Sequence, residues 1–536
     1  MKFPRLARLL PDWKNAFLAV LSAILLVLAF PDFEFWFLAW FALAPLFWAV
    51  EREKLSTAKS FVLGWIFGIC FFFGTCWWLT FAPVTYAAFP PLLAYFLLFC
   101  VTLVVGSFPG MFAAILSFLL RRFGRYAILT APFIWVFTEF LRYWLTGNNW
   151  NSIAYSQAFN DTLIGSASLG GIYLVGFWCV FFNSLISLIF RSFSRISDKG
   201  DDSAFSSKAG KDGLFVVMLS SIILPFAFFP NLSFSDHPTD RIEASIIAIQ
   251  PNVPMSGLDY DKLKQLRQKH VELAESSLQK LGRQPTSDDR RSVTVIFPES
   301  PMNFGYDEDP EFQEFIRVFA KKNNVHVLFN AAEPDPANKK YFNSAVMIDP
   351  HGRKVAQYDK IYLMPFGESV PAPIQNIVPA FVGSFSYGNE YDLLPIGDTK
   401  AGVMICFESH FGSLSREYVR NGADVLIEMT NDGYLGPTPV LRQHLANAVF
   451  RAVETNRPVL RVTNVGITAY INERGEVIEP TESYTEDTRN WTVSKSDGIQ
   501  TFYVRYGDWF AWLCSAVTLG LMVFGILRRI EAETRQ

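Results

Sequence analysis

The sequence is short of charge. Only 18% of its 536 residues are Asp, Glu, Lys or Arg, whereas about 25% is usual for a globular domain. Hydrophobic residues make up 51% and aromatic residues 16%, which excludes a disordered or collagen-like chain. The net charge of −3 provides no basic surplus for binding DNA or RNA, so we expect no nucleic-acid partner. The surplus of apolar residues is best accommodated in a lipid bilayer.

Long apolar runs are concentrated at the two ends of the chain. A helix of about 20 apolar residues crosses a bilayer, because its backbone groups are all bonded internally. We expect about eight such spans, at residues 15–30, 35–50, 60–79, 91–120, 127–143, 172–190, 213–230 and 507–527. Segment 91–120 contains Pro109 and Gly110, which predict a kink or a tilt. The first span lacks a small-residue cleavage site, so we interpret it as a retained anchor.

Loops rich in Lys and Arg alternate with loops that contain none. The rich segments are the N-terminus, residues 52–59, 121–125 and 191–211, and the C-terminus; the loops without Lys or Arg are 31–34, 80–90 and 144–171. Cytoplasmic loops carry the excess of Lys and Arg, which places both termini in the cytoplasm. The predicted organisation is a membrane domain at 1–230, an outer domain at 231–505, and a final span with a cytoplasmic tail at 506–536.

Residues 241–500 differ from the apolar ends of the chain in their sequence pattern, because short β-branched runs alternate with helical patterns. The expected strands are 244–251, 292–300, 325–332, 343–349, 401–409, 424–432 and 458–464. The expected helices are 259–281, 310–322, 412–421 and 440–456. Apolar strands separated by helices predict an α/β domain whose sheets are covered by helices.

Cysteine is scarce, and only one of the six residues, Cys406, lies in the predicted outer domain. A lone cysteine is as often a small buried apolar side chain as a reactive one. Cys406 ends an expected strand, however, and α/β proteins place their chemistry at strand ends. Glu299 and Lys360 stand at comparable strand ends. The carboxylate could accept the thiol proton and the ammonium could stabilise an oxyanion, which predicts a nucleophilic site.

Two histidines, His410 and His444, are alternative proton acceptors for the thiol, of which His410 is nearer in sequence. Within the membrane part, Glu139 and Arg142 stand three residues apart on one expected helix. This spacing favours an ion pair near the membrane surface over a functional charge.

Three motifs occur in the order found in the nitrilase, or carbon–nitrogen hydrolase, superfamily. They are PES at 298–300, YDKIYLMPFGE at 358–368 and ICFES at 405–409. Together with TND at 430–432, QHLANAVFRAVETNRPVLRVTNVG at 443–466 and the apolar spans, they make the chain similar to the apolipoprotein N-acyltransferases. The resemblance extends from WLTGNNWNSIAYSQ at 144–157 to the last span.

This resemblance implies a four-layer αββα domain in the periplasm, joined to membrane helices in the bacterial inner membrane. The implied reaction takes a fatty acyl chain from a phospholipid onto a cysteine as a thioester. The chain then passes to the N-terminal amine of a diacylglyceryl-cysteine apolipoprotein, which is the last step of lipoprotein maturation. No metal and no organic cofactor is implied.

The resemblance also implies roles for individual residues. Glu299 would be the general base, Lys360 the oxyanion stabiliser and Cys406 the nucleophile. Supporting or substrate-binding roles fall on Glu368, Glu408, Phe407, Trp150 and Asn343. Asn343 is more typical of a turn at the start of a strand, and Trp150 is equally typical of an interfacial anchor.

The sequence departs from the family pattern at several places. Phe407 stands where Tyr is common, and Asn148 and Asn149 replace the usual Phe-Pro before Trp150. The two positions after the Asn-Asp step that usually hold an aromatic pair hold Tyr434 and Leu435 here, so only the first is aromatic. Segment 362–390 contains aromatic residues that could form a lid or dip into the membrane, or simply pack on the domain. They are Phe366, Phe381, Phe385 and Tyr387.

Three other functions are compatible with parts of this pattern. A membrane-tethered amidase or nitrilase would use the same three residues, but a tether needs one span only. An inactive scaffold or lipid-binding protein would not need all of Glu299, Lys360 and Cys406. A transporter would be expected to carry more charged residues within its spans.

Overall fold

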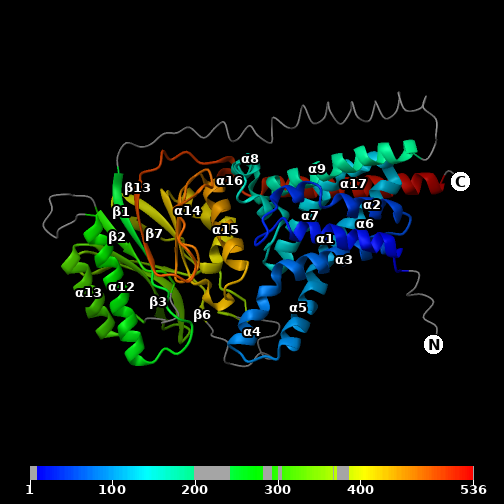
Figure 1. Ribbon diagram of the computed structural model, residues 1–536. Helices are drawn as coiled ribbons and strands as arrows, with labels where there is room; N and C mark the ends of the chain where they lie inside the picture. Colours follow the sequence, from blue (N-terminus) through cyan, green and yellow to red (C-terminus); the bar gives the residue numbers. More distant parts are fainter. Residues whose placement is uncertain are drawn as a thin grey trace. The chain divides into compact units, whose positions relative to one another are not determined.

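The computed structural model describes residues 9–197, 242–281, 292–299, 305–365, 367–370 and 385–534. They belong to two compact units, the first built from residues 9–197 and 508–534 and the second from residues 242–507 (Figure 1). The expected span at 213–230 and the aromatic residues Phe366 and Phe381 lie outside the described residues.

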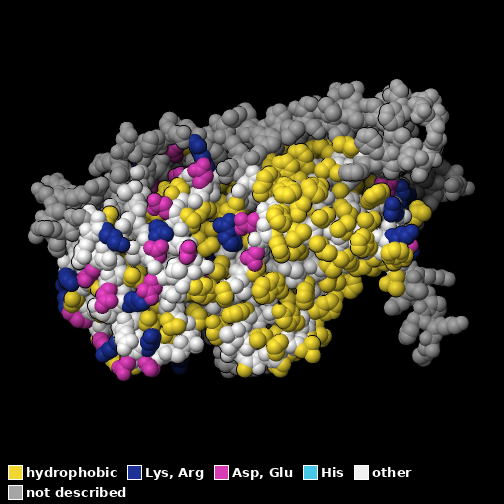
Figure 2. Space-filling view, viewed as in Figure 1, with side chains coloured by type: hydrophobic (Ala, Val, Ile, Leu, Met, Phe, Trp, Pro, Cys, Tyr) yellow, Lys and Arg dark blue, Asp and Glu magenta, His cyan; other side chains and the backbone are white. Residues whose placement is uncertain are grey.

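The first unit consists of apolar helices. Among the residues that the structure describes, 4 helical stretches are long and apolar enough to cross a membrane: Thr57–Thr85, Pro91–Phe123, Ala167–Ile189 and Trp509–Arg528. Helix α1 (Trp13–Val27) is apolar but shorter. Hydrophobic side chains cover most of the face of this unit seen in Figure 2. Among the exposed hydrophobic residues of the unit, Leu92 is 84% exposed. Such a continuous apolar surface suits contact with lipid.

Residues 35–50 do not form the single helix expected of a span. They comprise the 3-10 helix η1 (Trp36–Trp40) and most of helix α2 (Ala44–Arg52). A helix of 9 residues rises only about 14 Å. Asn183 satisfies the backbone at the break, because its Oδ1 accepts from the N–H groups of Leu43 (2.8 Å) and Ala44 (3.1 Å). Broken helices are tolerated at membrane depth when a neighbouring side chain bonds the freed backbone in this way.

The segment expected at 91–120 is divided at Gly106, and not at Pro109 and Gly110 as predicted. Helix α5 (Pro91–Val105) ends there, and helix α6 (Ser107–Phe123) follows directly. Pro109 lies in the first turn of α6, where its missing N–H costs no helical hydrogen bond. Helix α3 (Thr57–Cys76) packs very closely on α6. A Cβ atom added to Gly64 would lie 2.1 Å from the Pro109 carbonyl oxygen, so this crossing requires small residues.

The first unit, called the membrane-type unit below, contains two further long helices that pack beside α17 (Trp509–Thr534). Helix α7 spans Ala131–Thr146, and helix α9 spans Ala167–Ser197. Helix α9 is interrupted at Gly170 and Gly171, whose backbone angles are not helical. Both helices contact α17.

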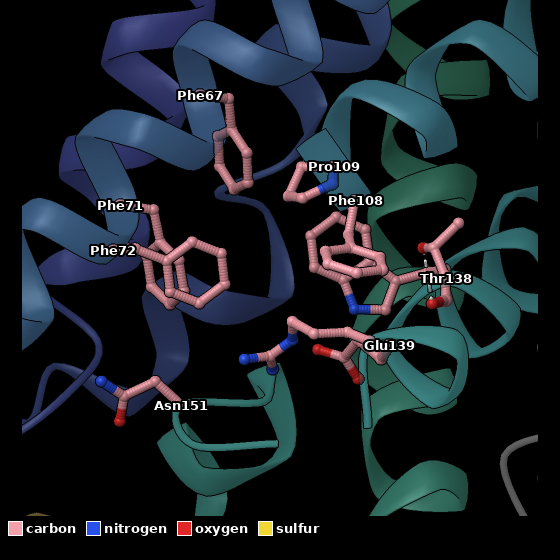
Figure 3. A pocket seen from close by; sticks show the side chains of 10 residues that line it. Phe67, Phe71, Phe72, Phe108, Pro109, Thr138, Glu139 and Asn151 are labelled. Carbon is pink, nitrogen blue, oxygen red and sulfur yellow. Dashed lines mark hydrogen bonds between the residues drawn. The ribbon is translucent and has the colours of Figure 1, made fainter. Parts of the chain in front are cut away.

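Glu139 and Arg142 of α7 are both buried; they attract each other electrostatically, and each also bonds to loop 149–153. Glu139 accepts from Ser152 Oγ (2.7 Å) and Ile153 N–H (3.0 Å), and Arg142 donates to Asn149 Oδ1 (2.9 Å) and the Trp150 carbonyl (2.9 Å). Both charges line a small cavity with several aromatic rings (Figure 3). Polar groups of a buried loop need partners in an apolar setting, and the two charges supply them.

The second unit contains two β-sheets. The seven-stranded sheet has the order β13-β1-β2-β3-β4-β5, with β6 beside β4. Its strands are β1 (Ile242–Gln250), β2 (Ser292–Ile296), β3 (His326–Asp335), β4 (Lys340–Ile348), β5 (Lys354–Asp359), β6 (Phe385–Ser386) and β13 (Asp487–Ser494). The six-stranded sheet has the order β12-β11-β10-β9-β8-β7. Its strands are β7 (Leu393–Ile396), β8 (Thr399–Ile405), β9 (Val425–Thr430), β10 (Val459–Thr463), β11 (Ala469–Ile471) and β12 (Val477–Ile478).

Helices cover the outer faces of both sheets (Figure 1). Helices α12 (Tyr260–Lys280) and α13 (Pro310–Asn323) pack on the seven-stranded sheet. Helices α14 (Gly412–Arg420) and α15 (Val440–Thr455) pack on the six-stranded sheet. The sheets face each other, with β1 against β10 and β4 against β8. The expected helix-covered α/β domain is confirmed, and its layers are αββα.

Candidate active site

Three strand ends carry the predicted catalytic residues. Glu299 follows β2, Lys360 follows β5 directly, and Cys406 follows β8 directly. The structure brings Glu299 and Lys360 together, with Lys360 Nζ 4.0 Å from Glu299 Oε1. The ammonium group is almost completely buried, with 1% of its side chain exposed. A buried cation requires anionic partners, and two glutamates provide them.

Glu368 is the nearer of these two partners. Its Oε1 accepts a hydrogen bond from Lys360 Nζ at 2.8 Å. Its Oε2 accepts from the backbone N–H of Met364 at 2.7 Å. The carboxylate is therefore fixed by its own loop and in turn fixes the ammonium group beside Glu299.

Asn343 lies inside β4 and bridges the two glutamates. Its Nδ2 donates to Glu299 Oε1 (3.1 Å) and to Glu368 Oε1 (2.6 Å). Its Oδ1 accepts from Asn330 of the neighbouring strand β3 (2.6 Å). The interpretation of Asn343 as a turn residue is wrong, because β4 begins three residues earlier at Lys340 and the side chain is held by residues distant in sequence.

A backbone group completes the surroundings of Glu299. The N–H of Asn431, which follows β9, donates to Glu299 Oε2 at 3.1 Å. Asn431 belongs to the TND motif at 430–432, from which no role was predicted for it. The contact could not be read from the motif, because it joins residues that are 132 positions apart.

Cys406 occupies a sharp turn between β8 and the 3-10 helix η8 (Cys406–His410). Its backbone φ is +53°, a left-handed conformation that is uncommon for residues other than glycine. The side chain is partly exposed. Strained backbone of this kind is concentrated at functional sites, where the surrounding structure holds it.

Glu408 ties the Cys406 turn to the segment that carries Lys360. Its Oε1 accepts from the hydroxyl of Tyr358 (2.8 Å) and the N–H groups of Ile361 (2.7 Å) and Tyr362 (3.0 Å). Its Oε2 accepts from the N–H of Ile405 at 2.9 Å. The side chain is fully buried, so its contacts are with protein groups on both sides of the site.

The two histidines take positions other than that of a proton acceptor for the thiol. The ring of His410 stacks on Phe407 at 5.6 Å between centroids. His444 Nε2 lies 3.1 Å from the carbonyl oxygen of Cys406. The carboxylates that lie beside Lys360 are those of Glu299 and Glu368.

The electrostatics of the cluster match proton transfer from sulfur to carboxylate. Burial raises the pKa of the Cys406 thiol, Glu299 raises it further, and Lys360 opposes both. Burial also raises the pKa of Glu299, although Lys360, Asn343 and the thiol lower it. Burial disfavours the charge on Lys360, but Glu368 and Glu299 keep its pKa above the usual value. A protonated thiol, a carboxylate of increased basicity and a permanent cation can support general-base activation of the thiol.

The remaining predicted residues lie in several different elements. Trp150 belongs to the membrane-type unit, where its ring packs on Trp78 at 5.7 Å. Of the aromatic residues in segment 362–390, Phe385 lies in β6 and Tyr387 is 61% exposed. Tyr434 and Leu435 lie in the 3-10 helix η9 (Asp432–Leu435). Within the described ranges, no group of three or more His, Cys, Asp or Glu residues is arranged to hold a metal ion.

Comparisons with known proteins cover both units. The family model described as the apolipoprotein N-acyltransferase N-terminal domain matches residues 22–185, and the carbon–nitrogen hydrolase model matches residues 249–501. An apolipoprotein N-acyltransferase of Geobacter metallireducens is 31% identical over 514 residues, which are 94% of each chain. An apolipoprotein N-acyltransferase of Thermotoga maritima is 28% identical, covering 97% of this chain and 95% of the relative.

Solved structures include a Saccharomyces cerevisiae member of the nitrilase superfamily. It is 16% identical, with a TM-score of 0.36, and covers 50% of this chain and 95% of its own. The full-length relatives and the two family models together show that the chain belongs to the apolipoprotein N-acyltransferase family and is an N-acyltransferase of the nitrilase superfamily.

Proposed function

We propose that this chain moves a fatty acyl group from a membrane phospholipid to the N-terminal amine of a diacylglyceryl-cysteine apolipoprotein, through a thioester on Cys406. The observation that carries the proposal is the buried Lys360 held between Glu299 and Glu368. It stands in a chain whose other unit contains, among the described residues, 4 helical stretches long and apolar enough to cross a membrane. No metal and no organic cofactor takes part.

In the first half-reaction, Glu299 accepts the thiol proton while Cys406 Sγ attacks the ester carbonyl carbon of the phospholipid. Lys360 Nζ donates to the oxyanion that forms on the carbonyl oxygen. The C–O bond to the glycerol then breaks. The proton on Glu299 passes to the leaving alkoxide, so a lysophospholipid departs and the acyl group remains on sulfur as a thioester.

In the second half-reaction, the α-amine of the apolipoprotein attacks the thioester carbonyl. Glu299 accepts a proton from the amine, and Lys360 again stabilises the oxyanion. The C–S bond breaks, the amide forms, and the proton on Glu299 returns to the thiolate. One base therefore serves both steps, which is the expectation for a ping-pong reaction.

Five residues are proposed to support this chemistry. Glu368 and Asn343 hold Lys360 and Glu299 in position, and Glu408 holds the Cys406 turn. Phe407, beside the nucleophile, and Trp150, in the membrane-type unit, are proposed to contact the lipid substrates. The apolar rings suit acyl chains better than a polar acceptor.

The membrane-type unit is proposed to keep the acyl tails in lipid while the ester reacts. Moving an acyl chain into water costs about 0.8 kcal/mol for each CH₂ group. We propose eight crossings of the bacterial inner membrane, with residues 35–50 crossing as a broken helix. Both termini would lie in the cytoplasm and residues 231–505 in the periplasm. The domain divisions remain 1–230, 231–505 and 506–536.

Separating the two half-reactions tests this proposal. Purified protein in phospholipid vesicles is incubated with a phospholipid carrying a radiolabelled acyl chain, washed, and then given a diacylated peptide. We expect the label to appear on the wild-type protein and then on the peptide, and to appear on neither with Cys406→Ala. Release of free fatty acid or ammonia without transfer would indicate a tethered hydrolase. Full transfer by Cys406→Ala would refute the thioester.

A further inference from the structure

A second buried charged cluster lies next to Cys406. It consists of His444 on α15, Asp432 on η9, Glu428 on β9 and Arg461 on β10, with 4% or less of any of these side chains exposed. Arg461 Nη1 lies 2.5 Å from Glu428 Oε2, and its Nη2 donates to Asp432 Oδ2 at 2.8 Å. With these contacts the arginine joins the two carboxylates.

Both ring nitrogens of His444 lie within hydrogen-bonding distance of oxygen atoms. Nδ1 is 2.7 Å from Asp432 Oδ1. Nε2 is 3.1 Å from the carbonyl oxygen of Cys406 and 3.1 Å from Glu428 Oε1. Nε2 is also 3.1 Å from Ser409 Oγ, whose own hydroxyl donates to the Cys406 carbonyl at 3.3 Å.

This arrangement favours the protonated imidazole. A neutral imidazole has a donor on one nitrogen and a lone pair on the other. A lone pair on Nδ1 would face the Asp432 carboxylate, and a lone pair on Nε2 would face the Cys406 carbonyl and Glu428, with only the Ser409 hydroxyl able to donate to it. The imidazolium donates from both nitrogens, and it also balances the charge, because two cations then face two anions.

The surrounding charges favour the same state. Burial disfavours the imidazolium and Arg461 repels it, but Asp432 and Glu428 raise the pKa of His444 to about 9. Burial opposes ionisation of the two carboxylates, yet the cations hold the pKa of Glu428 and of Asp432 below their usual values. His444 is thus a cation at neutral pH and is unsuited to accept the thiol proton.

We infer that His444 is a positioning residue, an imidazolium that donates to the carbonyl oxygen of Cys406 and holds the nucleophile in its left-handed turn. The inference rests on the proposed role of Cys406. The turn needs such support, because φ is +53° at this residue and relaxation would swing the sulfur away from Glu299 and Lys360. A displacement of about 1 Å at a reacting atom costs on the order of 100-fold in rate.

Two neutral replacements of His444 separate positioning from charge balance. In His444→Gln the side-chain amide reaches the position of Nε2 and can donate to the Cys406 carbonyl. In His444→Asn the amide reaches only the position of Nδ1, facing Asp432. Both variants remove the same charge, so a role limited to charge balance would affect them equally. His326→Gln, at the partly exposed start of β3, is the matched histidine control.

The readout is the rate of thioester formation on Cys406 from labelled phospholipid in vesicles, measured with the KM for that phospholipid. We expect the rate to fall at least 30-fold in His444→Asn and less than fivefold in His444→Gln, with KM changed less than twofold in both. His326→Gln should match the wild type. Equal rates in the two His444 variants would overturn the inference. Absence of any thioester on the wild-type protein would instead end the proposed function, and this role with it.

Nitrogen NMR of the protein labelled with ¹⁵N-histidine measures the protonation state in the wild type itself, with a variant used only to assign the signal. Loss of one resonance in His444→Gln, or in the alternative His444→Phe if Gln does not fold, assigns the signal. We expect both ring nitrogens of His444 to have the shifts of an imidazolium at pH 7.5. A neutral imidazole at this pH would overturn the inference whatever the variants do.

Discussion

The two sheets of the α/β unit contribute to the site in different ways. The seven-stranded sheet supplies side chains that contact one another, because Glu299, Lys360 and Glu368 form one charged cluster. The six-stranded sheet supplies Cys406, and its buried charges act on the backbone: Glu408 accepts from amide groups and His444 faces a carbonyl. Substitutions on the seven-stranded sheet should therefore lower the reaction rate while the fold stays intact. Substitutions on the second should loosen the geometry of the nucleophile.

Glu299→Gln tests the chemical side of this comparison with the largest expected effect. The amide keeps the shape of the side chain but cannot accept the thiol proton. We expect thioester formation to slow about 1,000-fold, within the range found for general-base residues. The measurement is single-turnover loading of Cys406 from labelled phospholipid.

The matched control is Glu311→Gln, an exposed carboxylate at the start of α13 that pairs with Lys264. It should load at the wild-type rate. If Glu299→Gln loaded within tenfold of the wild type, the carboxylate could not be the base.

Lys360→Met removes the cation between the two glutamates. We expect a loss of about 100-fold or more in the loading rate, comparable to removal of an oxyanion donor. Removing the cation also leaves two neighbouring carboxylates unneutralised, so the pKa of Glu299 should rise further. An unchanged pH profile together with a small rate loss would contradict the proposed contact.

The pH dependence of loading sharpens the assignment of Glu299. Burial raises the pKa of this carboxyl above its usual value of 4.5, and only the ionised form accepts a proton. The rate should therefore fall as pH decreases, about tenfold per pH unit below a midpoint that lies above 4.5. A midpoint at or below 4.5, measured where circular dichroism shows an intact fold, would count against Glu299.

Glu408→Gln tests the positioning side, with the smallest expected effect on rate. The amide oxygen can still accept from the Tyr358 hydroxyl and the neighbouring backbone N–H groups that now donate to Oε1. The amide NH₂ group would then face the Ile405 N–H, which now donates to Oε2. One buried hydrogen bond is lost, so we expect the free energy of unfolding to fall by about 1–3 kcal/mol. Loading should slow only about tenfold. A loss as large as that of Glu299→Gln would place Glu408 in the chemistry and blur the distinction between the sheets.

Much of the α/β unit could be predicted, because its periodic patterns are local. The expected helices at 259–281, 310–322 and 440–456 correspond closely to α12, α13 and α15. Cys406 follows a strand as expected, although the expected strand 401–409 extends beyond the end of β8 at Ile405, and β5, which precedes Lys360, was not among the expected strands. Short edge strands such as β7 and β12 were missed, because two to four residues give no recognisable period.

Tertiary contacts explain what the sequence could not reveal. Asn343 resembled a turn residue because its partners, Asn330 and the two glutamates, come from other segments. The spacing of Glu139 and Arg142 suggested a local pair, but not the hydrogen bonds that each charge makes with loop 149–153. His444 was considered only as a base, since its contacts with Cys406 and Glu428 exist only in the folded chain.

The residue that carries the acyl group is the most direct test of the proposed thioester on Cys406. Wild-type protein should be incubated with phospholipid vesicles, digested at neutral pH and analysed by mass spectrometry for fatty acyl adducts. We predict a single hydroxylamine-sensitive adduct on the peptide that contains Cys406, which disappears when a diacylated peptide is added. An acyl group on any other residue, or transfer to the peptide with Cys406 never modified, would contradict the account.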